Sequence, residues 1–212
     1  MSPPDRLIPA ELSASLGEGV IGRRIIVLES TGSTNDFLRQ MLAPELPEGL
    51  VVFAEAQTAG RGQRGNCWAS APYLGLWFSI LLRPVLPIAQ SARLTNWAAA
   101  AVAATIRSQT PLVPTIKLPN DVYVDGRKVA GVLVETKAGA GPQFDAIIGM
   151  GVNLNQEEED FPVELRGRAA SLALVLGQKI GRSAFAVALL RELERTRLTA
   201  LHIVESPHTL SP

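Results

Sequence analysis

Apolar residues fall partly into short runs of strand length and partly into segments with the three-to-four-residue spacing of a helix. Helical spacing predicts helices at 37–42, 90–107 and 183–198, with Ser183 as the cap of the last one. The strands and helices follow no regular βαβ alternation, so we expect an α+β domain with a mixed, largely antiparallel β-sheet and packed helices. Runs of β-branched and large apolar residues predict the strands, at 23–29, 50–56, 74–82, 115–117, 122–124, 129–137 and 144–155.

The ends of the chain lack this periodicity. Residues 1–22 are predicted to be a loose leader with room for one short helix, and residues 201–212 a C-terminal tail. A single domain is therefore expected at 23–200. Within it, Asp125-Gly126 lies between two predicted strands and indicates a tight hairpin turn.

Composition removes several classes of function. The 212 residues include 20 Lys+Arg and 20 Asp+Glu, so the chain lacks the basic excess of a nucleic-acid binder and no such partner is expected. The longest apolar runs are far shorter than the roughly 20 residues that span a bilayer, so no membrane association is expected. The lone Cys67 excludes an internal disulfide and a thiolate metal site, and the cytoplasm is the expected compartment.

The segment 57–72 is predicted to be a long loop, and long ordered loops are often functional. It contains GRGQRG at 60–65, which matches the G-x-G-x-x-G pattern of dinucleotide-binding proteins. No helix start follows these glycines, and no acidic residue lies about twenty positions further on, so that interpretation is rejected. A P-loop is rejected as well, because no Gly-Lys-Ser/Thr follows.

The loop composition suits an anionic ligand, since glycine permits close backbone approach and arginine donates to carboxylate and phosphate oxygens. Lys117, Asn120 and Asp121 place a cation, an amide and a carboxylate further along the chain. Lys128 precedes a strand, and a glycine-bearing strand at 148–155 indicates backbone close to a ligand or to another element. Together these residues suit nucleotidyl transfer onto a carboxylate. The plain alternatives are a solvated loop, a solvated strand-end charge and a bulged core strand.

Four ordered motifs resemble the catalytic domain of biotin protein ligases, in the biotin/lipoate ligase superfamily. The resemblance is strong over 23–155 and weak from there to residue 200, and it implies the class II aminoacyl-tRNA synthetase-like fold of that domain. The motifs are Ser33-Thr34-Asn35, AExQTAGRGxRGxxW at 54–68, KxPND at 117–121 and KxxGxxxE at 128–135, followed by GxGxNxN at 149–155.

The resemblance implies an ATP-dependent ligase that forms biotinyl-5'-AMP and passes biotin to a lysine of the biotin carboxyl carrier protein of acetyl-CoA carboxylase. It implies ATP and Mg²⁺ as cofactors, and catalytic roles for Lys128, Arg61 and Asp121. Lys128 and Arg61 would stabilise charge at the biotin carboxylate and the α-phosphate. Asp121 would serve the metal or orient the carrier lysine. The implied contacts to biotin and its adenylate are Ser33, Thr34, Asn35, Gln57, Gly60, Arg61, Gly62, Gln63, Arg64, Gly65, Trp68, Asn120, Lys128, Gly131, Gly151 and Asn153.

Both ends differ from those of longer family members. Segment 1–22 is too short for the winged-helix domain of repressor-type members, so no transcriptional repression is expected. Segment 201–212 leaves no room for a C-terminal β-barrel domain, so we expect the chain to be either a minimal form or a truncated one. An exposed sheet edge would allow a homodimer.

Two alternatives to a biotin ligase stay open. A lipoate or octanoate ligase or transferase shares the fold, and a non-catalytic homologue would bind biotinyl-adenylate without reacting it. The glycine-arginine loop favours biotin over lipoate, and the combination of Lys128, Arg61 and Asp121 favours an enzyme.

Gln63 and Leu118 depart from the family pattern, in which arginine and tryptophan are common at these positions. Leu118 should change packing beside the site. The missing charge at Gln63 should weaken retention of the adenylate, so that reactive intermediate escapes and labels nearby lysines. Gln63→Arg is therefore expected to reduce biotin labelling of a bystander protein, measured by streptavidin blotting. Unchanged labelling would contradict this hypothesis.

Overall fold

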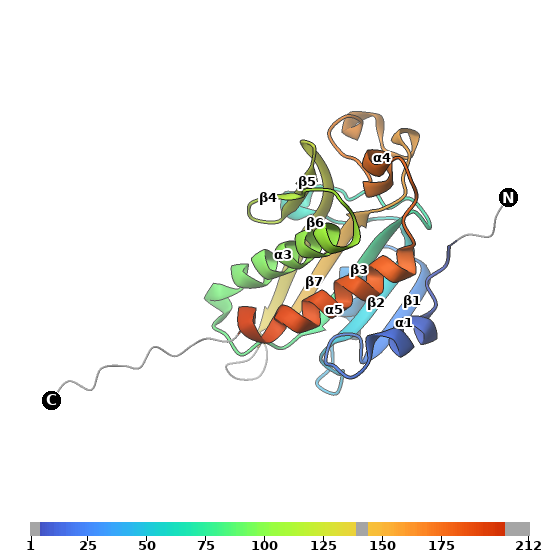
Figure 1. Ribbon diagram of the computed structural model, residues 1–212. Coiled ribbons are helices and arrows are strands. Elements are labelled where there is room, and N and C mark those ends of the chain that lie inside the picture. Colours follow the sequence, from blue (N-terminus) through green and yellow to red (C-terminus); the bar gives the residue numbers. More distant parts are fainter. Residues whose placement is uncertain (1–4, 139–143, 202–212) are drawn as a thin grey trace.

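The computed structural model describes residues 5–138 and 144–201, which form a single sheet with helices on both faces (Figure 1). The strand order is β1-β2-β3-β7-β6-β5-β4. The predicted tail at 201–212 lies outside the described residues except for Leu201. The strands are β1 (Arg24–Thr31), β2 (Leu50–Gln57), β3 (Gly75–Leu82), β4 (Thr115–Lys117), β5 (Asp121–Val124), β6 (Arg127–Ala138) and β7 (Phe144–Asn153).

Strand direction confirms the mixed, largely antiparallel sheet. β1 runs parallel to β2, whereas every other neighbouring pair is antiparallel. The predicted hairpin turn joins β5 to β6, where Asp125 and Gly126 both have positive φ, 49° and 73°. Two successive positive φ values fit the twist of a tight hairpin. β1 and β4 form the two edges of the sheet, and the homodimer stays a prediction.

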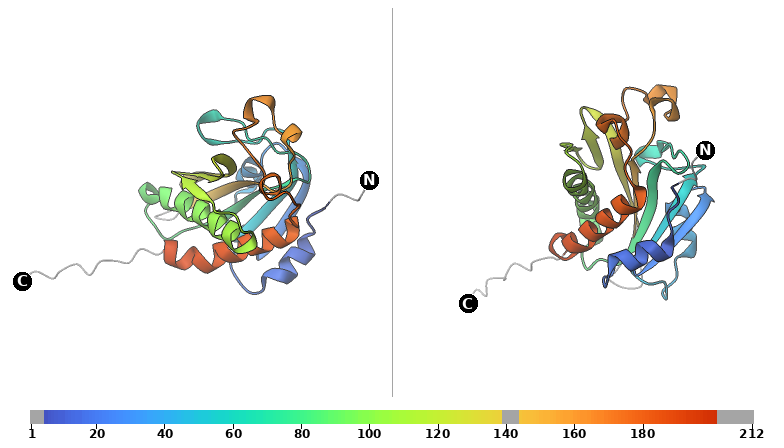
Figure 2. Two further views of the ribbon diagram at one scale, coloured as in Figure 1. Left: turned by 45° about the horizontal axis from the view of Figure 1, so that its top comes forward. Right: turned by 45° about the vertical axis from the view of Figure 1, so that its right-hand side comes forward.

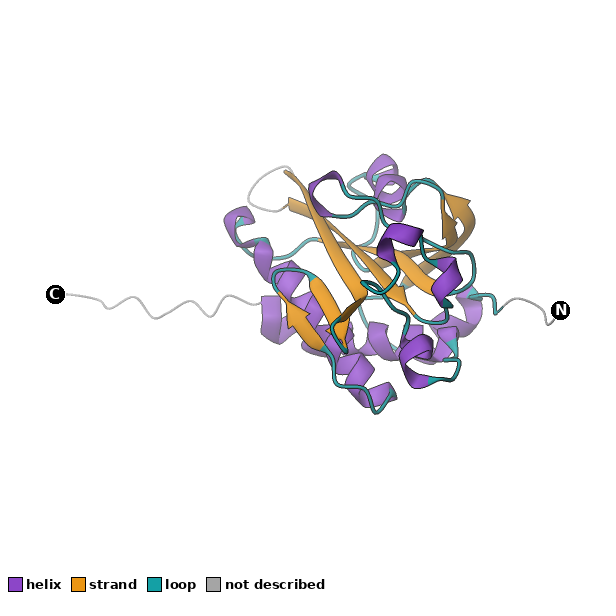
Figure 3. Ribbon diagram, turned by 90° about the horizontal axis from the view of Figure 1, so that it is seen from above, coloured by secondary structure: helices purple, strands orange, loops and turns teal. Residues whose placement is uncertain are grey.

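Alternate residues of β2 show how the sheet divides two cores. Val51 and Phe53 belong to the large cluster beneath α3 and α5, while Leu50 and Val52 pack in a smaller cluster with Leu38 of α2. The views in Figures 2 and 3 show the strands between these two groups of helices. The helices are α1 (Pro9–Leu16), α2 (Thr34–Met41), α3 (Ala92–Gln109), α4 (Leu172–Leu176) and α5 (Arg182–Leu201). None of the helices within these described segments is long and apolar enough to cross a membrane.

The leader at 1–22 is not loose over its described part. Leu7, Leu12 and Ile21 are buried in the main core, and α1 packs against α5. The backbone N–H of Leu7 also donates to Glu55 Oε1 over 2.8 Å. The sequence pattern did not predict this packing, because apolar residues are sparse in the leader. They are buried against α5, which lies more than 150 residues further along the chain.

The N-terminus of α5 corrects the predicted cap. α5 begins at Arg182, so Ser183 lies inside the helix. Asp5 of the leader serves this end instead, since its Oδ2 accepts from the backbone N–H of Arg182 over 3.2 Å. A cap supplied by a distant segment cannot be read from local sequence.

A buried ion pair joins α5 to β2. Arg182 is fully buried, and its guanidinium lies 2.5 Å from Glu55 Oε2 while also donating to the carbonyls of Gly75 and Asp5. Glu55 is 2% exposed, so each charge depends on the other for solvation. The pair thereby fastens the leader, α5 and β2 into one unit.

Arg182→Ala is expected to lower the free energy of unfolding by about 3–5 kcal/mol, because Glu55 would lose its partner while staying buried. Urea unfolding measures this. Arg195→Ala on the same helix is the control: its exposed pair with Glu192 should contribute no more than about 1 kcal/mol. Equal losses in the two variants would contradict this role of the buried pair.

Candidate functional site

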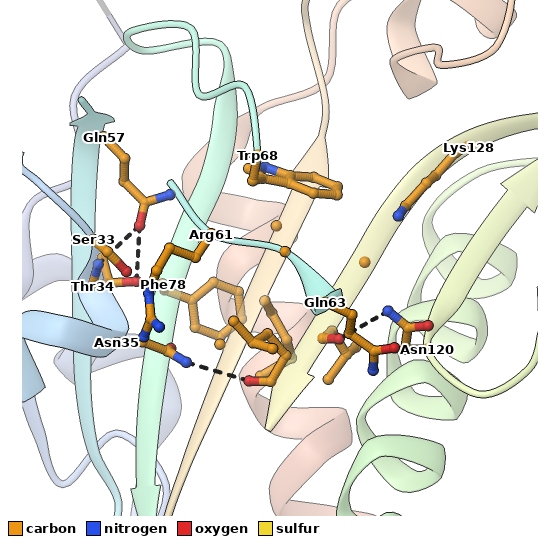
Figure 4. A pocket seen from close by; sticks show the side chains of 17 residues that line it. Ser33, Thr34, Asn35, Gln57, Arg61, Gln63, Trp68, Phe78, Asn120 and Lys128 are labelled. Carbon is orange, nitrogen blue, oxygen red and sulfur yellow. Dashed lines mark hydrogen bonds between the residues drawn. The ribbon is translucent and has the colours of Figure 1, made fainter. Parts of the chain in front are cut away.

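A cleft of about 450 Å³, part of it open to solvent, lies where the glycine-rich loop (residues 60–68) and the start of α2 meet the middle of the sheet (Figure 4). Polar groups occupy both ends, and apolar side chains from β3, β6 and β7 form part of the wall. The lining residues are Ser33, Thr34, Asn35, Gln57, Arg61, Gly62, Gln63, Trp68, Phe78, Asn120, Lys128, Gly131, Val132, Leu133, Gly149, Met150 and Gly151.

Two rows of paired residues across β3, β7 and β6 form the floor. In one row Ser79, Gly149 and Leu133 are partners. A Cβ at Gly149 would overlap the side chain of Asn35, so the missing side chain leaves the space that Asn35 occupies. Asn35, which enters from α2, is therefore seated directly on the backbone of the central strand.

In the second row Trp77, Gly151 and Gly131 are partners. Here Trp68 enters from the loop and lies over both glycines. A Cβ at Gly131 would stand 2.8 Å from its ring, and one at Gly151 would overlap the ring. These glycines provide space for Trp68, and because both also line the cleft, the predicted ligand contacts at Gly131 and Gly151 stay predictions.

The end of the cleft at the start of α2 carries a hydrogen-bonded cluster. Gln57 Oε1 accepts from the backbone N–H of Thr34 at 2.9 Å and from its hydroxyl at 3.2 Å, and Gln57 Nε2 donates to Ser70 Oγ. Ser33 is buried, and its hydroxyl does not cap α2 although it stands at the cap position. Its hydroxyl faces the cleft and can serve a ligand.

Lys128 lies at the other end of the cleft, at the start of β6. Its Nζ is 2.7 Å from Asp121 Oδ1 and 5.2 Å from the centre of the Trp68 ring. The neighbouring Asn120 is oriented by a hydrogen bond from its Nδ2 to the carbonyl of Val132, 3.1 Å long. Asp121 itself does not line the cleft and reaches it through Lys128.

The glycine-rich loop folds back on itself as a small hairpin. The backbone N–H of Trp68 donates to the carbonyl of Gly60 over 2.8 Å, and that of Gly62 to the carbonyl of Asn66 over 2.7 Å. The tip turns at Arg64, whose φ is 57°, and Arg64 is exposed outside the cleft. Gln63 points into the cleft beside Asn120 (Figure 4). The loop thus covers one side of the cleft.

Arg61, at the base of this loop, extends toward Asn35, away from Lys128 (Figure 4). Its guanidinium lies 2.5 Å from Glu135 Oε2 and 2.9 Å from Asp36 Oδ1. Burial raises the pKa of Glu135, but hydrogen bonds from Asn35 and Arg39 and the positive charge of Arg61 outweigh burial and hold that pKa below its usual value. Glu135 therefore stays ionised.

The structure brings most of the predicted contacts into one cleft. Gly60, Arg64, Gly65 and Asn153 do not line it. Asn153 is buried and held by structural bonds, since its Nδ2 donates to the carbonyl of Ala170 and its Oδ1 accepts from Gln156. Five residues of the site gave no signal in the sequence: Phe78, Val132, Leu133 and Met150 in the wall, and Ser79 beside it. Gly149 and Glu135 stand in the quoted motifs at 149–155 and 128–135, but the sequence assigned no site role to either.

Comparison with known proteins identifies the family. The family model described as the biotin/lipoate A/B protein ligase family matches residues 27–153. The chain belongs to this family. The matched span contains all four motifs and the whole floor of the cleft, so the resemblance inferred from the sequence is confirmed.

Three of the similar proteins are biotin ligases. The chain is 37% identical over 180 residues to the bifunctional ligase/repressor BirA of Bacillus subtilis, which covers 85% of this chain and 55% of that protein. It is 34% identical over 208 residues to the biotin–[acetyl-CoA-carboxylase] ligase of Mycobacterium tuberculosis, covering 92% and 73%. Among solved structures, the biotin protein ligase from Aquifex aeolicus in complex with biotin and ATP has a TM-score of 0.69 and 30% identity, covering 82% of this chain and 69% of that one.

The chain therefore spans about half the length of the BirA protein that it matches. The family and the fold class are shown for the part of the chain that matches these relatives.

Gly151→Ala is expected to displace Trp68 from the floor, because the new methyl group would overlap its ring. The displaced ring would also lose its contact with Lys128. We expect a red-shifted tryptophan emission and a loss of ligand affinity of at least about tenfold. Gly181→Ala is the control, since a Cβ there meets its nearest neighbour at 3.9 Å. An unchanged emission spectrum in Gly151→Ala would count against this packing.

Proposed function

We propose that this chain is the catalytic domain of a biotin protein ligase. It would convert biotin and ATP to biotinyl-5'-AMP and then transfer biotin to a lysine of the biotin carboxyl carrier protein of acetyl-CoA carboxylase. One observation carries the proposal: a single cleft joins the buried polar turn at Ser33 and Thr34 to the Lys128–Asp121 pair, with the glycine-rich loop alongside.

The polar end suits the ureido ring of biotin, which presents a carbonyl acceptor and two N–H donors. The buried Ser33 and Thr34 and the half-buried Gln57 offer hydroxyl and amide groups of both kinds. Such groups discriminate strongly against a ligand that cannot pair with them, because they would be left buried without partners. The apolar wall at Phe78 and Met150 suits the sulfur ring and the alkyl chain.

The cationic end suits the chemistry of activation. A carboxylate oxygen of biotin attacks the α-phosphorus of ATP, the bond to the β-phosphate oxygen breaks, and pyrophosphate leaves. Lys128 would stabilise the negative charge shared by the attacking carboxylate and the α-phosphate. The loop would shield the acyl-adenylate from water until the carrier lysine attacks its carbonyl carbon and AMP leaves.

Asp121 is proposed to serve the carrier lysine or Mg²⁺. Within the described residues there is no group of three or more His, Cys, Asp or Glu side chains that could hold a metal alone. A lone carboxylate fits Mg²⁺ nonetheless, because this ion usually binds one or two carboxylates together with substrate phosphates. Asp121 would hold it beside Lys128, just outside the cleft, and the ion would neutralise phosphate charge.

The proposal extends to the cellular compartment and to the partners of the protein. ATP consumption and a carboxylase subunit as acceptor suit the cytoplasm. The balanced charge of the chain gives no support to a nucleic-acid partner.

The direct test is incubation of the protein with ATP, Mg²⁺, labelled biotin and a biotin carboxyl carrier domain. Label on the carrier supports the ligase, and its appearance should require ATP. Adenylate without labelled carrier would restrict the activity to the first half-reaction. Labelling only when lipoate replaces biotin would overturn the proposal in favour of a lipoate ligase, and binding without adenylate would favour a non-catalytic homologue.

Lys128→Ala is expected to slow adenylate formation by about 100-fold or more, because one preorganised charge stabiliser commonly contributes roughly 3 kcal/mol. Pyrophosphate release measures the rate. Lys179→Ala, at an exposed position between α4 and α5, should leave the rate unchanged. Near-normal adenylation by Lys128→Ala with an intact fold would remove Lys128 from the mechanism.

A further inference from the structure

Glu135 occupies a junction between three elements beside the cleft. It projects from β6 with its side chain 21% exposed. Its Oε2 accepts from Asn35 Nδ2 at 2.8 Å and lies 2.5 Å from Arg61, while its Oε1 accepts from Arg39. One ionised carboxylate therefore connects the base of the glycine-rich loop to α2.

The bond to Glu135 sets the orientation of Asn35. Its Nδ2 faces the carboxylate and, at 3.4 Å, the carbonyl of Leu133, which both only accept. Asn35 Oδ1 must then be the atom that faces Ser79, so the Ser79 hydroxyl donates to it over 2.5 Å. The orientation of a buried amide is thus determined by a charge at the edge of the cleft.

The orientation of Asn35 also restricts the hydrogen bonds of Ser79 and Thr34. Because Ser79 gives its single proton to Asn35, it can only accept at its 2.7 Å contact with the Thr34 hydroxyl. The single hydroxyl proton of Thr34 then goes either to Ser79 or to Gln57. A lone pair on the Thr34 oxygen is left for a ligand N–H. Gln57 in turn donates to Ser70, which follows the loop. The hydrogen bonds therefore run from the start of the loop, around the polar turn, to the end of the loop.

Arg61 is the residue of the loop that Glu135 contacts. Its terminal nitrogen is held by two carboxylates, while its Nε is buried and, within the described part of the chain, makes no hydrogen bond. A buried donor without a partner is costly, and an oxygen of a bound ligand would satisfy it. Arg61 lines the cleft, so it is held firmly at one nitrogen with a second donor unused.

We propose that Glu135 is a positioning residue, which holds the base of the glycine-rich loop through Arg61 and orders the polar turn through Asn35. It touches no substrate. It acts on the proposed reaction by presenting the ligand-facing groups of the turn and the loop in one fixed arrangement. The inference rests on the proposed function for the identity of the ligand, whereas its effect on the loop is independent of any ligand.

The test compares Glu135→Gln with Asp145→Asn in the full chain. Asp145 is a matched control, because its side chain is also 21% exposed and also pairs with an arginine, Arg83, away from the cleft. Three quantities are measured for each: the melting temperature, hydrogen–deuterium exchange of residues 60–68 without ligand, and the Kd for biotin by calorimetry.

We expect both variants to lose similar thermal stability. In Glu135→Gln alone, exchange across 60–68 should rise by about tenfold and the Kd for biotin should rise by about tenfold. Loop exchange and biotin affinity equal to those of Asp145→Asn would overturn the proposal and leave Glu135 an ordinary ion-pair residue.

A double-mutant cycle tests whether Glu135 acts on the loop through Arg61. If Glu135 acts on the loop through Arg61, then adding Arg61→Gln to Glu135→Gln should raise loop exchange by less than about twofold beyond the larger single effect. Additive effects would overturn the route through Arg61. Failure of the unaltered protein to bind biotin would remove the proposed function, while the exchange comparison would still decide whether Glu135 positions the loop.

Discussion

The site depends on the absence of side chains at three glycines in the middle of the sheet. Gly149 gives its space to Asn35, and Gly151 and Gly131 give theirs to Trp68. Because β3, β7 and β6 are held in antiparallel register, these positions fall in two adjacent rows on the same face. A helix and a loop that are distant in sequence can therefore lie directly on the strand backbone, and the cleft is what remains between them.

Paired charges surround this cleft. Lys128 and Arg61 both line it, and each already has a carboxylate partner, Asp121 for one and Glu135 with Asp36 for the other. Pairing orients the cations before a ligand arrives, which lowers the reorganisation needed when an anionic group enters. It also means that an incoming anion adds to an existing pair.

The polar groups of the cleft are also oriented by their partners before a ligand binds. Ser79 is fully buried and has a single proton to donate, so the directions of the hydrogen bonds from Glu135 through Asn35 to Ser79 follow from one another. The proposed recognition at Thr34 and the proposed anchoring of the loop at Arg61 are then two ends of one network. In a ligase of the proposed kind, this links binding of the acyl substrate to the loop that would cover its adenylate.

The sequence by itself determined the fold class, all seven strands to within a few residues, the hairpin turn at Asp125-Gly126 and the family. Those features depend on local periodicity, on turn residues and on ordered motifs, which a single chain displays. Twelve of the predicted contacts also line the cleft, since motif residues gather where backbone from several strands converges: Ser33, Thr34, Asn35, Gln57, Arg61, Gly62, Gln63, Trp68, Asn120, Lys128, Gly131 and Gly151.

Only the tertiary structure decided which of these side chains meet. It placed Trp68 on Gly131 and Gly151, paired Arg61 with Glu135, and drew the leader onto α5 with Asp5 at the helix N-terminus. Each of these contacts joins residues far apart in the chain. Its formation depends on strand register and on the packing of helices against the sheet, and neither leaves a local pattern in the sequence.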